Sequence, residues 1–133
     1  MVKITPKRIF LEEVIEETKS KSSGCLVTYI GLIRDNSRGK KVLEVEYEDK
    51  GDAKSKLEEI ISEASKIWPL NNILLVHRVG RLKVGEVNLV LCIASSHRKE
   101  GFEACQYIID RFKEISPTFK KETYTDGTVF TSN

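Results

Sequence analysis

The sequence contains no apolar run that approaches the roughly 18 residues needed to cross a membrane. Its first residues, from Met1 to Ile4, lack the apolar segment of a secretory signal peptide. These two absences argue against a membrane protein and against a secreted one. We therefore expect a soluble protein of the cytoplasm.

Cysteine is scarce, and its spacing gives no sign of a metal site. Cys25, Cys92 and Cys105 are far apart, and each lies in an apolar segment. There is no Cys-x-x-Cys pair, and one of the two histidines, in His77-Arg78 at a strand end, is interpreted as solvated or structural. We expect reduced core cysteines, no metal and no cofactor. A catalytic cysteine is disfavoured because none lies in an evidently cationic, exposed segment.

A large charge of either sign is also missing, since 22 Lys and Arg face 20 Asp and Glu for a net charge of +2. RNA binding would therefore need a local cluster of cations rather than bulk charge. No glycine-rich phosphate loop followed by lysine and Ser/Thr is present, which argues against a phosphotransferase. With 133 residues and 40% hydrophobic content, residues 1–133 are expected to form one domain with a sizeable core.

Hydrophobic periodicity predicts a mixture of helices and strands. Helices are expected over residues 5–19, 52–67 and 98–115, and strands over residues 25–33, 42–48, 73–77, 87–94 and 118–124, with a hairpin at Asp126-Gly127. The inward side chains are expected to be Leu11, Val14 and Ile15 in the first helix and Leu43, Val45 and Tyr47 in the second strand. Several connections are too short for a crossover helix, so we expect an α+β fold with a mainly antiparallel sheet. Its exposed strand edges favour dimerisation.

The third expected helix begins with cations. Ser96 is the expected N-cap, which puts His97 and Arg98 in the first turn. Unpaired backbone N–H groups and the positive end of the helix dipole favour an anion at that position. The segment therefore indicates a site for a phosphate or carboxylate group.

Lys113 falls on the predicted buried stripe of the same helix, which consists of Phe102, Cys105, Ile109 and Phe112. At roughly 100° per residue, the eleven steps from Phe102 to Lys113 return to within about 20° of the same direction. One interpretation is a lysine whose stem covers apolar surface while its ammonium reaches solvent. The other is a lysine of lowered pKa in a partly desolvated pocket, useful as acid, base or nucleophile.

Other cations are expected near Lys113. The strand that follows the helix places Lys120 and Lys121 on opposite faces, so one of them points inward. Arg98, Lys113 and that lysine are expected to converge on one pocket. Arg34, which ends a long apolar strand, is either a surface arginine or a guanidinium at the mouth of this cleft.

Taken in order along the chain, a set of short motifs resembles the MoaE-like large subunit of molybdopterin synthase. The motifs are residues 29–35 (YIGLIRD), 68–70 (WPL), 77–82 (HRVGRL), 85–86 (GE), 96–98 (SHR), 102–104 (FEA) and 119–122 (FKKE), together with Lys113 and Pro117. Each motif is weak by itself. The ordered set, from about residue 25 to 130, is highly specific.

The resemblance implies an α/β hammerhead fold with an additional antiparallel sheet. It implies a homodimer that binds a small ubiquitin-like, MoaD-like subunit at each end, which makes a heterotetramer. The Gly-Gly tail of the small subunit carries a thiocarboxylate that donates sulfur to cyclic pyranopterin monophosphate, and two such transfers form the dithiolene of molybdopterin. The implied activity is that of a sulfurtransferase in molybdenum cofactor biosynthesis.

The resemblance also implies residue roles by position. Lys113 and Lys120 match catalytic lysines, and the substrate-binding positions are Arg34, His97 and Arg98, with Tyr29 where the family often has phenylalanine. Phe119 and Phe130 stand where many relatives have tryptophan, and the segment after Phe130 is shorter than in some members. A contribution of the tail to the neighbouring protomer's site is therefore left unassigned.

The main alternative is a non-enzymatic module that binds RNA. Its basic strip would consist of Arg34, Arg38, Lys40, Lys41, Lys120 and Lys121. Such a strip needs exposed aromatic side chains on which bases stack, and only Tyr29, Phe119 and Tyr124 are candidates.

Overall fold

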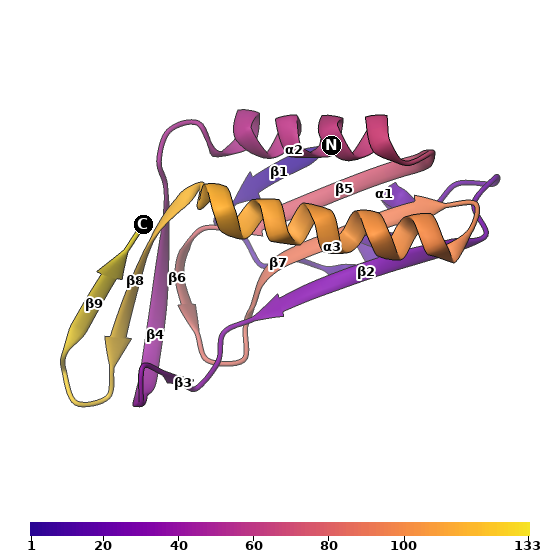
Figure 1. The fold of residues 1–133 in the computed structure, drawn as a ribbon. Helices are drawn as coiled ribbons and strands as arrows, with labels where there is room; N and C mark the ends of the chain where they lie inside the picture. The colour runs from indigo at the N-terminus through magenta and orange to yellow at the C-terminus, as the bar shows by residue number, and fades with distance from the viewer.

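Two β-sheets and three helices make up the structure, a computed structural model that describes residues 1–133 (Figure 1). The first sheet has the strand order β1 (Val2–Thr5), β5 (Leu70–Arg78), β7 (Val87–Ser95), β2 (Cys25–Leu32). The second has the order β3 (Asn36–Ser37), β4 (Lys40–Asp49), β8 (Thr118–Tyr124), β9 (Val129–Ser132), and β6 (Gly80–Lys83) also pairs with β4. Only β1 and β5 pair in parallel, which confirms the expected α+β class with mainly antiparallel strands.

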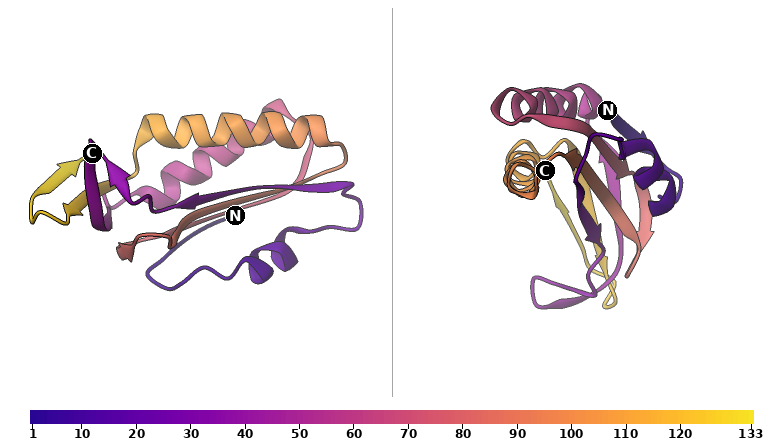
Figure 2. Two further views of the ribbon diagram at one scale, coloured as in Figure 1. Left: turned by 90° about the horizontal axis from the view of Figure 1, so that it is seen from below. Right: turned by 90° about the vertical axis from the view of Figure 1, so that its right-hand side faces the viewer.

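Helices cover both faces of the first sheet (Figure 2). Helices α2 (Ala53–Ile67) and α3 (Arg98–Ile115) lie on one face, and the short α1 (Leu11–Thr18) lies on the other. The central strand β7 serves both cores, because Leu89, Leu91 and Ile93 pack toward α2 and α3 while Val90 and Cys92 pack toward α1. None of the three helices is both long and apolar enough to span a membrane.

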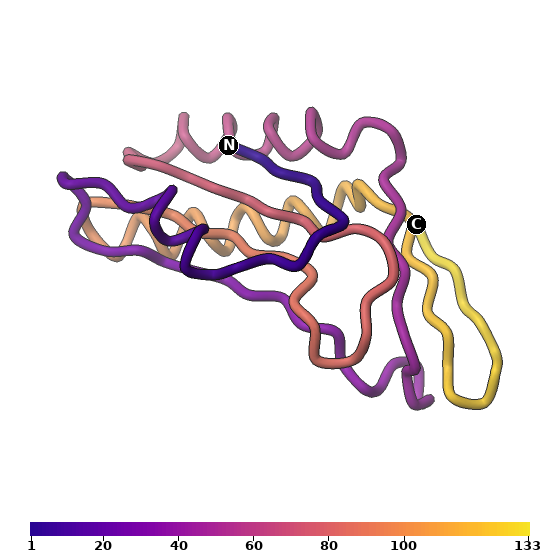
Figure 3. Tube along the Cα trace, turned by 180° about the vertical axis from the view of Figure 1, so that it is seen from behind, coloured from indigo at the N-terminus to yellow at the C-terminus, as the bar shows by residue number.

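The second sheet projects from one end of the first (Figure 3). It has a small apolar core of its own, which consists of Ile33, Val42, Val45, Leu82 and Tyr124. The chain passes between the two sheets at the C-terminal end of α3, where β8 begins (Figure 1). Side chains of both sheets meet at this junction.

The prediction for the N-terminal segment was wrong about where the helix starts and about which of its side chains face inward. Residues Val2–Thr5 form a strand, because Val2 and its neighbours pair with β5 and Val2 is buried. The expected helix starts only at Leu11, since the Thr5 hydroxyl accepts a hydrogen bond from the Lys7 N–H at 3.0 Å and stabilises a turn instead. Of its three expected inward residues only Val14 is buried, and Leu11 and Ile15 are exposed.

A bulge shifts the inward face of β4. The ladder with β8 changes register between Val42 and Glu44, so Val42 is buried and Leu43 points to solvent. Val45 is buried as expected, and Tyr47 is half-buried. The expectation for Leu43 was therefore wrong, while Tyr47 keeps its inward direction.

Helix α3 has the predicted bounds but presents a different face to the sheet. Its buried residues are Gly101, Ala104, Ile108 and Phe112, whereas Phe102 is 61% exposed. The physical reason is close packing, since a Cβ at Gly101 would lie 2.8 Å from both Val27 Cγ2 and Ser95 Oγ. The two smallest residues of the helix therefore face the sheet, and Lys113 lies at the rim of this face with an exposed side chain.

We expect Gly101→Ala to lower the free energy of unfolding by about 1–3 kcal/mol, because overpacking outweighs the better helix propensity of alanine. Urea denaturation measures the change. The matched control is Gln106→Ala, at an exposed position of the same helix, where we expect a change within about 0.5 kcal/mol. A Gly101→Ala protein as stable as its parent would contradict the close packing of α3.

Candidate active site

A sharp reversal of the chain brings Lys113 and Lys120 to the same region. Helix α3 ends at Ser116, which adopts a left-handed conformation with φ 45° and donates its N–H to the Phe112 carbonyl at 3.1 Å. Pro117 cannot continue the helix, and β8 starts at the next residue. Lys113 therefore stands on the last turn of α3 and Lys120 on the strand that returns past it.

Three cations share this region. The pKa of Lys113 is lowered from its ordinary 10.5, first by partial burial and then by repulsion from Lys120 and Arg34. Arg34 arrives from the first sheet, two residues beyond the end of β2. The structure thus brings together three of the cations that the sequence singles out, and we name Arg34, Lys113 and Lys120 the cationic cleft.

The two lysines of β8 face opposite ways, as expected from strand geometry. In the ladder with β4, Lys120 lies opposite Tyr47 and Lys121 lies opposite Glu46. Lys120 is half-buried and points into the cleft, while Lys121 is exposed. Lys120 is therefore the inward lysine of the pair.

A small cavity of about 50 Å³ lies beside these cations. Its lining residues are Leu32, Ile33, Arg34, Asn36, Ser37, Val45, Tyr47, Lys120 and Glu122. Among these residues, the sequence pointed to a functional role only for Arg34 and Lys120. Tyr47 was visible only as an inward residue of its strand, and the buried Glu122 only as the last letter of a motif.

His77 is fully buried, so of its two interpretations, solvated or structural, the structural one agrees with its position. Its Nδ1 lies 3.1 Å from the Asn88 carbonyl oxygen, and burial lowers the pKa of its imidazole below the usual 6.5. Arg78 instead forms an ion pair with Glu86 at 2.9 Å, which agrees with a structural role. A neutral imidazole thus lies beneath the cationic cleft.

His97 and Arg98 lie at the opposite end of α3 from Lys113. With about 1.5 Å of rise per residue, the fifteen steps from Arg98 to Lys113 span about 22 Å. The expected convergence of Arg98 with Lys113 in one chain was therefore wrong, because the whole helix separates them (Figure 1).

The start of α3 has the character of an anion site. A cavity of about 450 Å³ there is lined by Gly24, Cys25, Ser96, His97, Arg98 and Lys99. His97, not Ser96, is the N-cap residue, and no side chain caps the first turn. The Ser96 hydroxyl donates instead to the Ser22 carbonyl at 3.5 Å, so the first backbone N–H groups of the helix are left without a side-chain partner.

Tyr29 lies between these regions, half-buried in β2 and packed against the main core. Burial raises the pKa of Tyr47 to about 12, and the nearby Glu122 and Tyr29 add to this rise. No group of His, Cys, Asp and Glu side chains is arranged to hold a metal ion.

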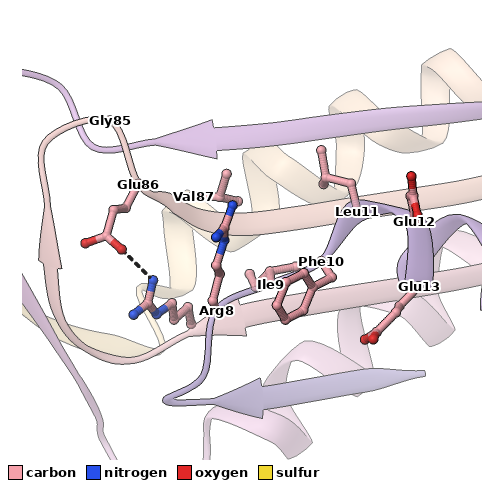
Figure 4. Close-up of a pocket in the computed structure, with 10 residues that line it drawn as sticks. Arg8, Ile9, Phe10, Leu11, Glu12, Glu13, Gly85, Glu86 and Val87 are labelled. Atoms are coloured by element: carbon pink, nitrogen blue, oxygen red, sulfur yellow. Dashed lines mark hydrogen bonds and ion pairs between the residues drawn. The ribbon is translucent and has the colours of Figure 1, made fainter.

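A larger cavity of about 690 Å³ lies on the α1 side of the first sheet (Figure 4). Arg8, Phe10 and Leu11 line one wall, and Glu86, which pairs with Arg78, lines another. None of the candidate residues borders this cavity. The cationic cleft therefore lies apart from this cavity.

Comparisons with known proteins agree on one family. The family model described as MoaE protein matches residues 4–115. The molybdopterin synthase catalytic subunit of Halalkalibacterium halodurans is 35% identical over 125 residues, which cover 93% of this chain and 80% of that protein.

Solved structures agree with this match. The crystal structure of molybdopterin synthase from Staphylococcus aureus matches with a TM-score of 0.91 and 32% identity, covering 98% of this chain and 96% of that one. A complex of subunits 1 and 2 of molybdopterin-converting factor from Helicobacter pylori matches with a TM-score of 0.80, over 99% of this chain and 90% of that one. At 17% identity, the latter shows the fold alone.

We expect Lys120→Gln and Arg34→Gln each to raise the pKa of Lys113, because each removes a like charge from its surroundings. NMR titration of the lysine side chains measures the shift. The control Lys54→Gln removes a cation from the exposed side of α2 and should leave the titration of Lys113 unchanged.

The same shift affects stability. Between the folded pKa of Lys113 and its ordinary 10.5, the folded protein binds fewer protons than the unfolded chain. Lys113 therefore makes the free energy of unfolding rise with pH over that window.

If neither Lys120→Gln nor Arg34→Gln moved the titration of Lys113, the three cations would not be coupled.

Proposed function

The chain belongs to the MoaE family, and from this premise we propose that its cationic cleft is the place where sulfur is transferred. The activity is that of the catalytic subunit of molybdopterin synthase. Sulfur passes from the thiocarboxylated tail of a small ubiquitin-like subunit to cyclic pyranopterin monophosphate and forms the molybdopterin dithiolene. The observation that carries the placement is the convergence of Arg34, Lys113 and Lys120, with a lowered pKa at Lys113.

The cleft suits this reaction because both reactants are anions. A cyclic phosphate and a thiocarboxylate repel each other in water, and three nearby cations offset that repulsion and stabilise negative charge in the transition state. The lowered pKa of Lys113 makes it the lysine better suited to exchange a proton during turnover. Lys120 and Arg34 then supply the charge that holds the anions.

The sulfur must come from a partner. No cysteine lines the cleft, and Cys25 lines only the cavity at the start of α3. Cys92 is buried, and burial raises the pKa of Cys105 and so disfavours its thiolate. A flexible Gly-Gly tail is narrow enough to enter a groove between two sheets, whereas a folded domain is not. The small subunit therefore docks outside the cleft and inserts only its tail.

We place the binding of the substrate phosphate at His97 and Arg98. These residues lie about 22 Å from Lys113 in their own chain, too far for one small substrate to reach both. In the homodimer, His97 and Arg98 of one protomer can complete the site of the other. Each site then takes Lys113, Lys120 and Arg34 from one chain and the phosphate-binding end of α3 from its partner.

Two further proposals concern the domain organisation and the cellular compartment. We treat residues 1–133 as one functional unit, because the cleft takes side chains from both sheets. We also place the protein in the cytoplasm, a compartment that keeps thiols reduced, since its three cysteines are all free.

Nothing favours the alternative of RNA binding. In the basic strip, the Arg38 guanidinium lies 3.7 Å from the centre of the Phe130 ring, and Lys40 pairs with Asp126 at 3.3 Å. These cations are satisfied within the chain. An open basic surface with stacking platforms is therefore not formed.

We expect Lys113→Ala to lose nearly all turnover in an assay with the thiocarboxylated small subunit and cyclic pyranopterin monophosphate. Its stability should not fall, because the change relieves repulsion within a group of like charges. Lys120→Ala should lose less activity, and Lys54→Ala should keep the parent rate. A small subunit without its terminal Gly-Gly should bind yet give no product. A folded Lys113→Ala protein with near-normal kcat would refute the placement of the reaction.

Mixed dimers test the shared site. Arg98→Ala should weaken substrate binding by about 1.5–3 kcal/mol, the value of a hydrogen bond to a charged group. Random mixing of Arg98→Ala and Lys113→Ala chains should restore up to about one quarter of the parent activity, since half of the dimers carry one intact site. If each site lay within one chain, no mixed dimer would contain an intact site and mixing would restore nothing.

A further inference from the structure

Tyr47 occupies a position in the cleft for which the family resemblance gives no role. It lies directly opposite Lys120 in the ladder between β4 and β8, so the two side chains leave the same face with Cβ atoms about 4.5–5.5 Å apart. It also lines the small cavity together with Arg34 and Lys120. A phenol group therefore stands beside two of the three cations.

Aromatic packing holds the Tyr47 ring in place. The centre of the His77 ring lies 5.2 Å from that of Tyr47 at an interplanar angle of 70°. On its other side His77 contacts the Phe112 ring at 5.5 Å and 62°. Phe112 immediately precedes Lys113 in α3, and Tyr47 lies in β4 opposite Lys120. The three stacked rings therefore connect β4 to the part of α3 that carries Lys113.

Asn88 orients both polar rings of the stack. Its side-chain Nδ2 donates to the Tyr47 hydroxyl at 3.1 Å, and its backbone carbonyl lies 3.1 Å from His77 Nδ1. A carbonyl only accepts, so His77 carries its proton on Nδ1. Gly31 gives Asn88 its room, because a Cβ there would lie 2.7 Å from Asn88 Oδ1.

The proton of the Tyr47 hydroxyl is left without an acceptor in the chain. Asn88 occupies a lone pair of the phenol oxygen, and Tyr47 donates no hydrogen bond to another residue. Burial raises the pKa of Tyr47 to about 12, so the hydroxyl stays protonated at neutral pH. It can serve as a donor in the cleft and not as a base.

We propose that Tyr47 is a further functional residue of the cationic cleft, whose hydroxyl donates a hydrogen bond to the anionic oxygen of the thiocarboxylate, while Asn88 and His77 are positioning residues. This inference rests on the proposed function, which brings that group to Lys113 and Lys120. The thiocarboxylate is favoured over the substrate phosphate, because the proposed function already gives the phosphate its own binding residues, His97 and Arg98 at the start of α3. A fixed donor stabilises charge on that oxygen during transfer.

The test is Tyr47→Phe, which keeps the ring and its contact with His77 and removes only the hydroxyl. We expect kcat to fall roughly 10- to 100-fold, as for the loss of a hydrogen bond to a charged group, with unchanged affinity for cyclic pyranopterin monophosphate. The matched control is Tyr107→Phe, which removes a hydroxyl that donates to Glu63 at 2.9 Å on the surface between α2 and α3. The control should keep the parent kcat.

Asn88→Asp tests the direction of the proton. The introduced carboxylate accepts the phenol proton and draws it away from the cleft, so we expect a loss of kcat similar to that of Tyr47→Phe. The double variant should be no slower than the worse single variant, because both changes remove the same donor. Additive losses would indicate a general structural effect and overturn the inference.

The outcomes separate the inference from the proposed function. If the parent protein makes no dithiolene product with the thiocarboxylated small subunit, the proposed function fails. If the parent is active and Tyr47→Phe keeps its kcat, only the role of Tyr47 fails, whatever happens to substrate affinity. Should Asn88→Asp not fold, Tyr47→Phe and its control still decide the matter.

Discussion

Close packing of α3 on the first sheet determines where the candidate residues of that helix lie. Gly101 and Ala104 bring the helix against β2 and β7, and the helix then runs straight to Phe112 and Lys113. One end presents His97 and Arg98, and the other end places Lys113 just before β8 of the second sheet. The spacing of about 22 Å between the two ends is a property of the helix itself. The proposed phosphate site and the proposed sulfur-transfer site are thereby kept apart in each chain and can be joined only across a dimer.

The junction between the sheets is electrostatically unfavourable in the free protein. Three cations face one cleft, and partial burial together with their mutual repulsion lowers the pKa of Lys113. Two uncharged rings lie in the layer beneath them, since burial keeps His77 neutral and Tyr47 protonated, and the buried Glu122 lines the same cavity. A bound anion relieves the repulsion among the three cations, which favours the binding of anionic reactants.

Much of the fold and half of the site could be predicted from local sequence. Helix α3 has the predicted bounds, because an apolar period, a cationic start and Pro117 mark it without help from the rest of the chain. The reversal from Lys113 to Lys120 is equally local, and strand alternation already separates Lys120 from Lys121. The separation of Arg98 from Lys113 was also available from the sequence. The expectation that they converge ignored the rise of about 1.5 Å per residue along the helix.

Tertiary packing decided the remainder. Val2–Thr5 forms a strand because it pairs with β5. This pairing cannot be predicted from the local sequence. The face that α3 buries depends on how closely Gly101 approaches Val27. Leu43 is exposed because of a bulge in the ladder of β4 with β8. Tyr47 is far from His77 and Asn88 in the sequence, and the three meet only where the two sheets join. The sequence by itself determined the cations and the elements that carry them, because helix period, strand alternation and chain stops are local. Only the tertiary structure decided which neutral groups lie beneath those cations, because that depends on contacts between elements distant in the chain.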